Sequence, residues 1–160
     1  MSDSAVTFSA EELAQGAGGR WTDGRGSAAS GVFTDTRQDG SGRLFIALSG
    51  ENFDAHDFLP AAVSAGAAAL CVAESKLGRL PEPCPVPVLA VADPLRSYQG
   101  IARLHRRRFP ELTVAAVTGS VGKNSVKEML RAIFTAAAGA ERVLYTVGNT
   151  NNQVGVPPNL

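Results

Sequence analysis

The sequence predicts an α/β protein, in which a small N-terminal α/β domain is followed by the start of a second domain built on a parallel sheet. Short apolar runs rich in β-branched residues alternate with segments whose apolar residues recur at helical spacing. A glycine-bearing turn, residues 118–122, stands between one such run and one such helical segment. The length of 160 residues suits a small domain plus part of another, and 44% hydrophobic residues are enough for a globular core.

The composition excludes several classes of protein. The formal net charge is zero, so the overall balance favours neither nucleic acid nor an acidic membrane surface as a partner. No apolar run approaches the ~20 residues of a membrane-spanning helix, and the N-terminus has neither a basic start nor an apolar stretch. Cys71 and Cys84 are too few for a disulfide framework and are expected to be reduced thiols. We expect a soluble cytoplasmic protein.

The N-terminal domain is expected to contain two short helices and several strands. Ser9 and Glu12 form a capping box at the start of the first helix, and Trp21 is expected to begin a strand and to serve in packing rather than as a ligand platform. Pro87 indicates an edge strand or the first residues of a strand. The further strands are predicted at residues 31–37, 43–48, 67–73 and 86–91, and the second helix at 59–66.

The domain boundary is predicted near Ala92, giving domains of residues 1–92 and 93–160. Asp93 is a good N-cap and Pro94 suits the first helical position, so a helix is expected from Pro94 to about Phe109. Its last turn is rich in arginine. A nucleic-acid patch and a solvated helix end whose cations complement the macrodipole are both possible readings, and the neutral chain favours the second.

Residues 113–125 predict a phosphate-binding loop. An apolar strand at 113–117 leads through Gly119 and Gly122 to Lys123 and into a helical pattern, so that backbone N–H groups can point at an anion and the lysine can reach terminal phosphates. The plain pattern G-x-x-x-x-G-K-[ST] fails, because Val117 occupies its first glycine position and Asn124 follows the lysine. A second buried strand is expected at residues 142–147, paired in parallel through a right-handed crossover.

Residues 49–58 form a polar loop that follows the apolar strand at 43–48, and ligands bind at this end of strands in α/β folds. His56 lies beside Asp54 and Asp57. Taken alone, this grouping fits an acid/base pair, a metal site or a helix cap, of which the cap is favoured.

Several separated segments resemble the Mur ligase family. Residues 117–123, followed by 126–129, are similar to the ATP loop of these ligases. Residues 35–37, 44–50 and 53–58 resemble the uridine-nucleotide-binding N-terminal domain of the family. The order of the segments makes the resemblance more specific than any single motif.

The resemblance implies roles for individual residues. ATP would be held by Thr118, Gly119, Ser120, Val121, Gly122, Lys123, Asn124 and Ser125, with Lys123 catalytic and Asn124 in the position of the magnesium ligand. The substrate would be held by Thr36, Arg37, Ser49, Gly50, Phe53, Asp54 and His56, and by Asn149, Asn151 and Asn152. Arg37 can pair with a phosphate or fasten the loop to an Asp. Asn124 departs from the Ser or Thr that usually ligates magnesium, and Pro158 replaces a larger apolar residue.

The resemblance also implies an activity. Residues 148–157, Gly-Asn-Thr-Asn-Asn-Gln-Val-Gly-Val-Pro, are most similar to the branch that uses ATP and Mg²⁺ to join D-Ala-D-Ala to UDP-N-acetylmuramoyl-tripeptide through an acyl phosphate, a step of peptidoglycan synthesis. The resemblance covers essentially the whole chain but less than half of such an enzyme. We therefore expect the N-terminal part of a ligase, inactive alone, with uncovered apolar surface in residues 113–160. This half is expected either to dock on the first domain or to associate between copies of the chain.

Three alternatives stay open. A sister ligase would add a different amino acid, against which residues 149–157 argue. A self-sufficient P-loop ATPase or kinase would need a second acidic metal ligand on a later strand, which this sequence lacks. A non-catalytic nucleotide-binding module would keep the uridine-nucleotide site while Asn124 disables ATP chemistry.

Overall fold

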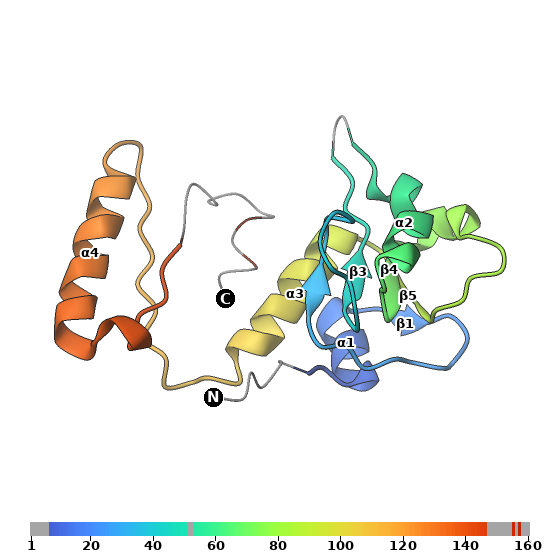
Figure 1. Cartoon of the computed structure of the whole chain (residues 1–160), viewed down its shortest axis with the longest axis horizontal. Helices are drawn as coiled ribbons and strands as arrows, with labels where there is room; N and C mark the ends of the chain where they lie inside the picture. The colour runs from blue at the N-terminus through green and yellow to red at the C-terminus, as the bar shows by residue number, and fades with distance from the viewer. Residues whose placement is uncertain (1–6, 51–52, 147–154, 156, 158–160) are drawn as a thin grey trace. The chain divides into compact units, whose positions relative to one another are not determined.

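The chain forms two compact units, Met1–Arg108 and Phe109–Asn159. The structure is a computed structural model that describes residues 7–50, 53–146, 155 and 157 (Figure 1). The division follows Arg108 rather than Ala92, where the sequence places the boundary. The physical reason is that helix α3 (Pro94–Arg106) packs against helix α1 (Ala10–Ala17) and so belongs to the first unit.

The first unit is built on a five-stranded sheet with strand order β1-β5-β4-β3-β2, which confirms the expected α/β class. Strands β2 to β5 are parallel, whereas β1 pairs antiparallel with β5 at one edge. The bounds are β1 Arg20–Trp21, β2 Val32–Phe33, β3 Leu44–Ile46, β4 Ala69–Ala73 and β5 Val88–Val91. These strands are shorter than the apolar runs that predict them. Pro87 stands just before an internal strand, so the edge position considered for it is wrong.

Both faces of the sheet are buried along β3, β4 and β5, and successive residues of these strands alternate between two apolar clusters. One cluster joins strand residues to α1 and α3; the other joins them to helix α2 (Leu59–Ser64). The strand residues of the first cluster are Leu44, Ile46, Ala69, Cys71, Leu89 and Val91, and those of the second are Phe33, Phe45, Leu70, Val72 and Val88. Burial raises the pKa of the Cys71 thiol to about 12 and keeps it protonated.

The predicted caps are confirmed. The Ser9 hydroxyl accepts from the Glu12 N–H at 3.2 Å, and the Glu12 carboxylate accepts from the Ser9 N–H at 2.8 Å, so α1 starts with a capping box. Asp93 caps α3, with Pro94 at its first position. The Trp21 indole packs against the first cluster and donates to the Ala10 carbonyl at 2.9 Å, which fits a packing role.

The last turn of α3 and the residues that follow it are basic, and one of these cations is used within the first unit. The Arg108 guanidinium pairs with Glu12 at 2.6 Å and lies over the Phe8 ring, 4.6 Å from its centroid. This contact fastens the end of the first unit to the start of α1. No helix among the described residues is both long and apolar enough to cross a membrane.

The second unit consists, in its described part, of helix α4 (Lys123–Ala138), a 3-10 turn η3 (Ala140–Arg142) and extended segments (Figure 1). The predicted buried strands at 113–117 and 142–147 are not found among the described residues, and Val114 and Leu144 are 57% and 96% exposed. Parallel strands need neighbours and cover on both faces, which the described residues here do not supply. The uncovered apolar surface expected for this region is therefore present.

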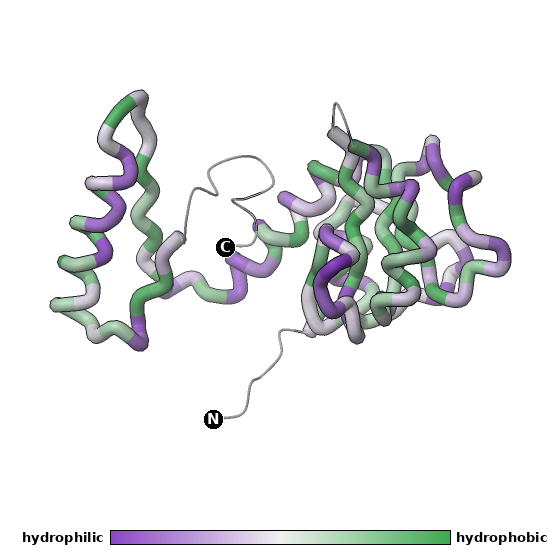
Figure 2. Tube along the Cα trace, turned by 45° about the horizontal axis from the view of Figure 1, so that its top comes forward, coloured by the Kyte–Doolittle hydropathy of each residue, from purple (hydrophilic) through white to green (hydrophobic). Residues whose placement is uncertain are grey.

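Hydrophobic and hydrophilic residues are interspersed along helix α4 (Figure 2). Its Met129 and Ile133 are 63% and 60% exposed. Two contacts tie the helix to the segment after η3: Lys127 Nζ donates to the Thr146 carbonyl at 3.0 Å, and the Arg131 guanidinium lies 4.0 Å from the Tyr145 ring centroid.

The close crossing of α1 and α3 provides a test of the packing. A Cβ on Gly100 would lie 2.1 Å from the Gly16 carbonyl oxygen, so Gly100→Ala must push the helices apart. We expect the free energy of unfolding to fall by about 2 kcal/mol. Urea unfolding followed by the fluorescence of Trp21, the only tryptophan, measures this.

Gly78→Ala is the matched control, because a Cβ on Gly78 would meet nothing within 4 Å. Its free energy of unfolding should stay within about 0.5 kcal/mol of wild type. Equal effects of the two substitutions would contradict the close crossing.

Candidate functional site

The loop that follows β3 is closed at its base by backbone pairing. Ser49 and Asp54 form an antiparallel bridge, the Gly50 N–H donates to the Phe53 carbonyl at 2.7 Å, and the Ala55 N–H donates to the Leu48 carbonyl at 2.8 Å. Asp54 then caps the 3-10 helix η1 (Ala55–Phe58), which confirms the favoured helix-cap interpretation. The loop therefore leaves the carboxyl end of β3 and returns directly, with residues 51–52 outside the described part of the chain.

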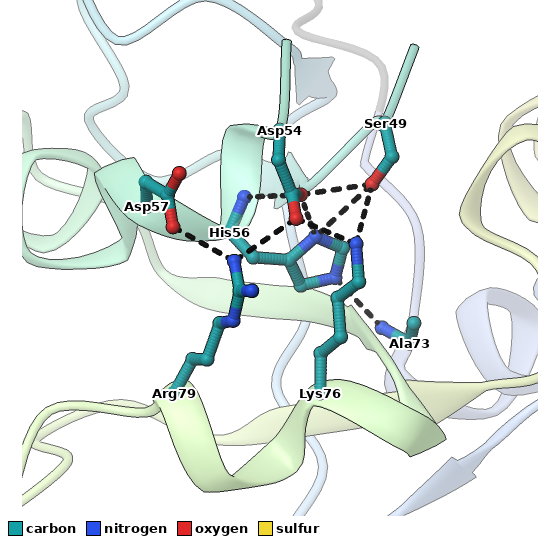
Figure 3. Close-up of polar contacts among 7 residues, drawn as sticks. All are labelled: Ser49, Asp54, His56, Asp57, Ala73, Lys76 and Arg79. Atoms are coloured by element: carbon teal, nitrogen blue, oxygen red, sulfur yellow. Dashed lines mark hydrogen bonds and ion pairs between the residues drawn. The ribbon is translucent and has the colours of Figure 1, made fainter. Parts of the chain in front are cut away.

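The Asp54 carboxylate accepts hydrogen bonds from five donors (Figure 3). We call Ser49, Asp54, His56, Lys76 and Arg79 the Asp54 cluster. The donors are Lys76 Nζ at 2.6 Å, His56 Nδ1 at 2.6 Å, Ser49 Oγ at 2.8 Å, Arg79 Nη1 at 3.0 Å and the His56 N–H at 3.1 Å. The Lys76 ammonium above all holds the pKa of Asp54 well below its usual range, with the His56 and Ser49 donors adding to this.

The His56 ring connects this cluster to the sheet. Its side chain is fully buried, and Nε2 accepts from the Ala73 N–H at 3.1 Å, at the carboxyl end of β4. Because Nε2 accepts a backbone N–H, the ring proton lies on Nδ1, which donates it to Asp54. His56 thus fixes the position of Asp54 relative to β4. Among the residues described, no three His, Cys, Asp or Glu side chains gather as a metal site would require.

Lys76 and Arg79 both rise from the 3-10 helix η2 (Glu74–Arg79), which directly follows β4 (Figure 3). Arg79 Nη1 is shared between Asp54 at 3.0 Å and Asp57 at 2.8 Å. Sequence reasoning missed these two cations, because it treats residues 74–85 as a loop rich in proline and charge. The available signal was two basic residues three positions apart at the carboxyl end of a buried strand.

Thr36 and Arg37 follow β2. Because β2 and β3 are parallel, the segments after both strands leave the sheet at the same edge. Arg37 Nη2 pairs with Asp35 at 2.6 Å, and this pairing lowers the pKa of the Asp35 carboxyl to about 2. This pair lies within a single segment, two residues apart, and the guanidinium stays exposed. The two uses expected for Arg37, pairing with a phosphate and fastening the loop to an Asp, remain predictions.

The glycine loop of the second unit leads directly into α4, as the sequence predicts. Gly119 and Gly122 have φ values of 146° and 79°, which side chains rarely tolerate, and Lys123 is the first helical residue. The Lys123 ammonium donates to the Gly119 carbonyl and, at 3.5 Å, to the Ser120 carbonyl.

The start of α4 suits an anion. The first intrahelical bond runs from the Val126 N–H to the Gly122 carbonyl at 3.0 Å, which leaves the N–H groups of the first turn without an intrahelical partner, and the helix has no side-chain cap. Asn124 and Ser125 are exposed in this turn. The exposed amide oxygen of Asn124 is a suitable ligand for Mg²⁺. The residues present therefore fit phosphate groups together with a bound metal ion.

Asn149, Asn151 and Asn152 lie outside the described residues. The Asp54 cluster belongs to the first unit and the glycine loop to the second.

Residues 117–160 match the Mur ligase middle domain. The chain is 44% identical over 129 residues to the UDP-N-acetylmuramoyl-tripeptide--D-alanyl-D-alanine ligase of Escherichia coli, covering 81% of this chain and 26% of that protein. It is 45% identical over 127 residues to the ligase of the same name from Haemophilus influenzae, covering 79% of this chain and 26% of that protein. The chain belongs to the Mur ligase family.

Solved structures agree with this family membership. This Mur ligase chain superposes on a crystal structure of MurF from Acinetobacter baumannii with a TM-score of 0.80 and 32% identity, covering 97% of this chain and 33% of that one. A MurF ligase from Thermotoga maritima in complex with ADP matches with a TM-score of 0.56 and 25% identity, covering 79% of this chain and 27% of that one. The Mur ligase chain thus spans about a quarter of the length of the curated relatives first matched.

The depressed pKa of Asp54 predicts an acid-dependent stability of the first unit. A carboxyl whose pKa is lower in the folded than in the unfolded state stabilises fully above pH ~4, and this stabilisation is lost as the pH falls further. Asp54→Asn should lower the free energy of unfolding by about 2 kcal/mol at pH 7 and flatten its decline below pH ~4. Urea unfolding followed by Trp21 fluorescence from pH 7 to 3 measures both effects.

Asp57→Asn is the control, because the Asp57 side chain is 63% exposed and pairs only with Arg79 among the described contacts. Its effect should stay below about 1 kcal/mol. An Asp54→Asn curve parallel to that of wild type would contradict the assigned pKa direction.

Proposed function

We propose that this chain is the part of a peptidoglycan-precursor ligase that holds UDP-N-acetylmuramoyl-tripeptide and ATP, and that the whole enzyme joins D-Ala-D-Ala to the tripeptide in the cytoplasm. The observation that carries this proposal is the 44% identity, over 129 residues, to a ligase named for that reaction. The geometry supports it, because the chain contains both a polar loop with a paired base at the carboxyl edge of a parallel sheet and a glycine loop at a helix start.

The uridine diphosphate end of the substrate would lie at the carboxyl edge of the sheet. Ser49, Gly50 and Phe53 offer a hydroxyl, backbone groups and an exposed ring that stacks on Phe58 with centroids 5.5 Å apart. Thr36 and Arg37, which leave the same edge, would add a hydroxyl and a cation for a phosphate. Asp54 and His56 would serve the substrate by fixing the loop, since the His56 side chain is fully buried.

ATP would lie at the glycine loop. The MurF ligase from Thermotoga maritima that matches this chain is in complex with ADP, which supports an adenine nucleotide as the ligand. Lys123 and the N–H groups from Thr118 to Ser125 would hold the phosphates, with the Asn124 oxygen as a ligand for Mg²⁺, whose charge would offset that of the phosphoryl oxygens. The asparagines 149, 151 and 152 would contact phosphate and the sugar-peptide.

The chemistry of the whole enzyme would have two steps. A carboxylate oxygen of the tripeptide attacks the γ-phosphorus of ATP, the bond to ADP breaks, and an acyl phosphate forms, with Lys123 stabilising the transferred phosphoryl group. The amine of D-Ala-D-Ala then attacks the acyl carbon, inorganic phosphate leaves with the bonding electrons, and the amine gives up a proton. Because the chain spans about a quarter of its relatives, we expect no ligase turnover from these 160 residues alone.

A non-catalytic nucleotide-binding module is the second candidate, and the observation in its favour is Asn124 in place of a hydroxyl residue. ATP titrations of wild type and Asn124→Thr, each with and without magnesium, separate the two. Magnesium should strengthen ATP binding to wild type if Asn124 ligates the metal, and only to the Thr variant if it does not.

The proposed function predicts saturable binding of UDP-N-acetylmuramoyl-tripeptide to the 160-residue chain. In an NMR titration, the amide shifts should cluster at Thr36, Arg37, Gly50 and Phe53, because these residues leave one edge of the sheet. ADP, titrated as the control, should shift the amides of residues 118–125 instead. Absence of binding, or shifts confined to other segments, would contradict the assignment.

A further inference from the structure

Lys76 joins the two ends of the loop that follows β3. Its ammonium donates to the Asp54 carboxylate at 2.6 Å and to the Ser49 hydroxyl at 3.1 Å, and its side chain is 28% exposed (Figure 3). Ser49 and Asp54 are the paired residues at the base of the loop. One cation therefore contacts both sides of the loop's base from a different element, η2.

The lysine also determines how the Ser49 hydroxyl is used. The hydroxyl donates its proton to Asp54 Oδ1 at 2.8 Å and accepts from Lys76 at 3.1 Å, and the protonated His56 Nδ1 lies 3.4 Å from the same oxygen. A charged donor makes a stronger and more directional bond than a neutral one. The hydroxyl rotor and the start of the loop are thus held in one orientation before any ligand arrives.

Arg79 differs from Lys76 in the end of the loop that it contacts. Its guanidinium contacts Asp54 and Asp57, and no contact to Ser49 is found among the described residues. Both cations neutralise the Asp54 carboxylate, whereas Lys76 also reaches the other end of the loop. Substitutions of Lys76 and Arg79 can therefore separate two effects, the neutralisation of the Asp54 charge and the connection between the two ends of the loop.

We propose that Lys76 is a positioning residue for nucleotide binding, which holds Ser49, Gly50 and Phe53 in the arrangement that receives the uridine diphosphate group. The inference rests on the proposed function for the identity of the ligand. Lys76 lies outside every segment that carries the family resemblance, and its role follows from its contacts. Preorganisation of this kind improves affinity by lowering the ordering cost on binding.

The test uses the full 160-residue chain and four proteins: wild type, Lys76→Met, Lys76→Arg and Arg79→Gln. Calorimetric titration with UDP-N-acetylmuramoyl-tripeptide should give a Kd about 10-fold higher for Lys76→Met, an intermediate value for Lys76→Arg, and a value within about 2-fold of wild type for Arg79→Gln. The partial recovery in Lys76→Arg distinguishes a charged donor from simple packing by the aliphatic stem.

A second measurement needs no ligand. The Gly50 N–H donates to the Phe53 carbonyl, so its hydrogen exchange reports closure of the loop. NMR exchange should be about 10-fold faster at Gly50 in Lys76→Met than in wild type or Arg79→Gln, with exchange in β4 unchanged. If Lys76→Met fails to fold, as judged by Trp21 fluorescence, Lys76→Arg against Arg79→Gln provides the same comparison.

The outcomes separate the two proposals. A wild-type chain that does not bind the uridine nucleotide overturns the proposed function and the nucleotide part of this inference, while Gly50 exchange still decides whether Lys76 closes the loop. Normal wild-type binding with equal Kd values and equal Gly50 exchange in Lys76→Met overturns the role of Lys76 alone. Equal losses in Lys76→Met and Arg79→Gln also overturn it, because they would reflect only the charge on Asp54.

Discussion

The first unit depends on covering both faces of a short parallel sheet. Strands β3, β4 and β5 are buried throughout, and their successive residues point to opposite faces of the sheet. Each face therefore needs an apolar layer packed against it. Helices α1 and α3 supply one side and α2 supplies the other. The close approach of Gly16 and Gly100 lets α1 and α3 share their side of a narrow sheet. The second unit, in its described part, has no such cover, and its apolar segments remain extended and exposed.

The same sheet positions the site. Adjacent parallel strands end at one edge, so the segment after β3 and the segment after β4 meet there although they are distant in sequence. His56 connects the two segments, because its ring accepts the N–H of Ala73, the last residue of β4, and donates to Asp54 in the segment after β3. The Asp54 carboxylate in turn accepts hydrogen bonds from Lys76 and Arg79 of η2. A buried imidazole with both nitrogens bonded is thus the link between the rigid sheet and the loop proposed to receive the nucleotide.

Local signals were sufficient to predict much of this. Ser9 and Asp93 mark helix starts through their own neighbours, Asp54 is recognisable as a cap, and the glycines before Lys123 indicate a turn into a helix. Non-local contacts were out of reach. The pairing of Lys76 with Ser49 and Asp54 depends on β3 and β4 being neighbours, which the spacing of apolar residues does not encode. The strands expected at 113–117 and 142–147 have the right composition, but composition does not provide the neighbouring strands that burial requires.

Cover on both faces decides which apolar runs of this chain become strands. Hydrogen exchange on the 160-residue chain, resolved by residue, tests this most directly. The amides of β3 and β4 should exchange only on unfolding of the first unit, whereas those of residues 114–117 should exchange at rates within about 10-fold of an unstructured peptide. Protection of residues 114–117 comparable to that of β3 would rule out this role of cover, because it would require a covered sheet in the second unit.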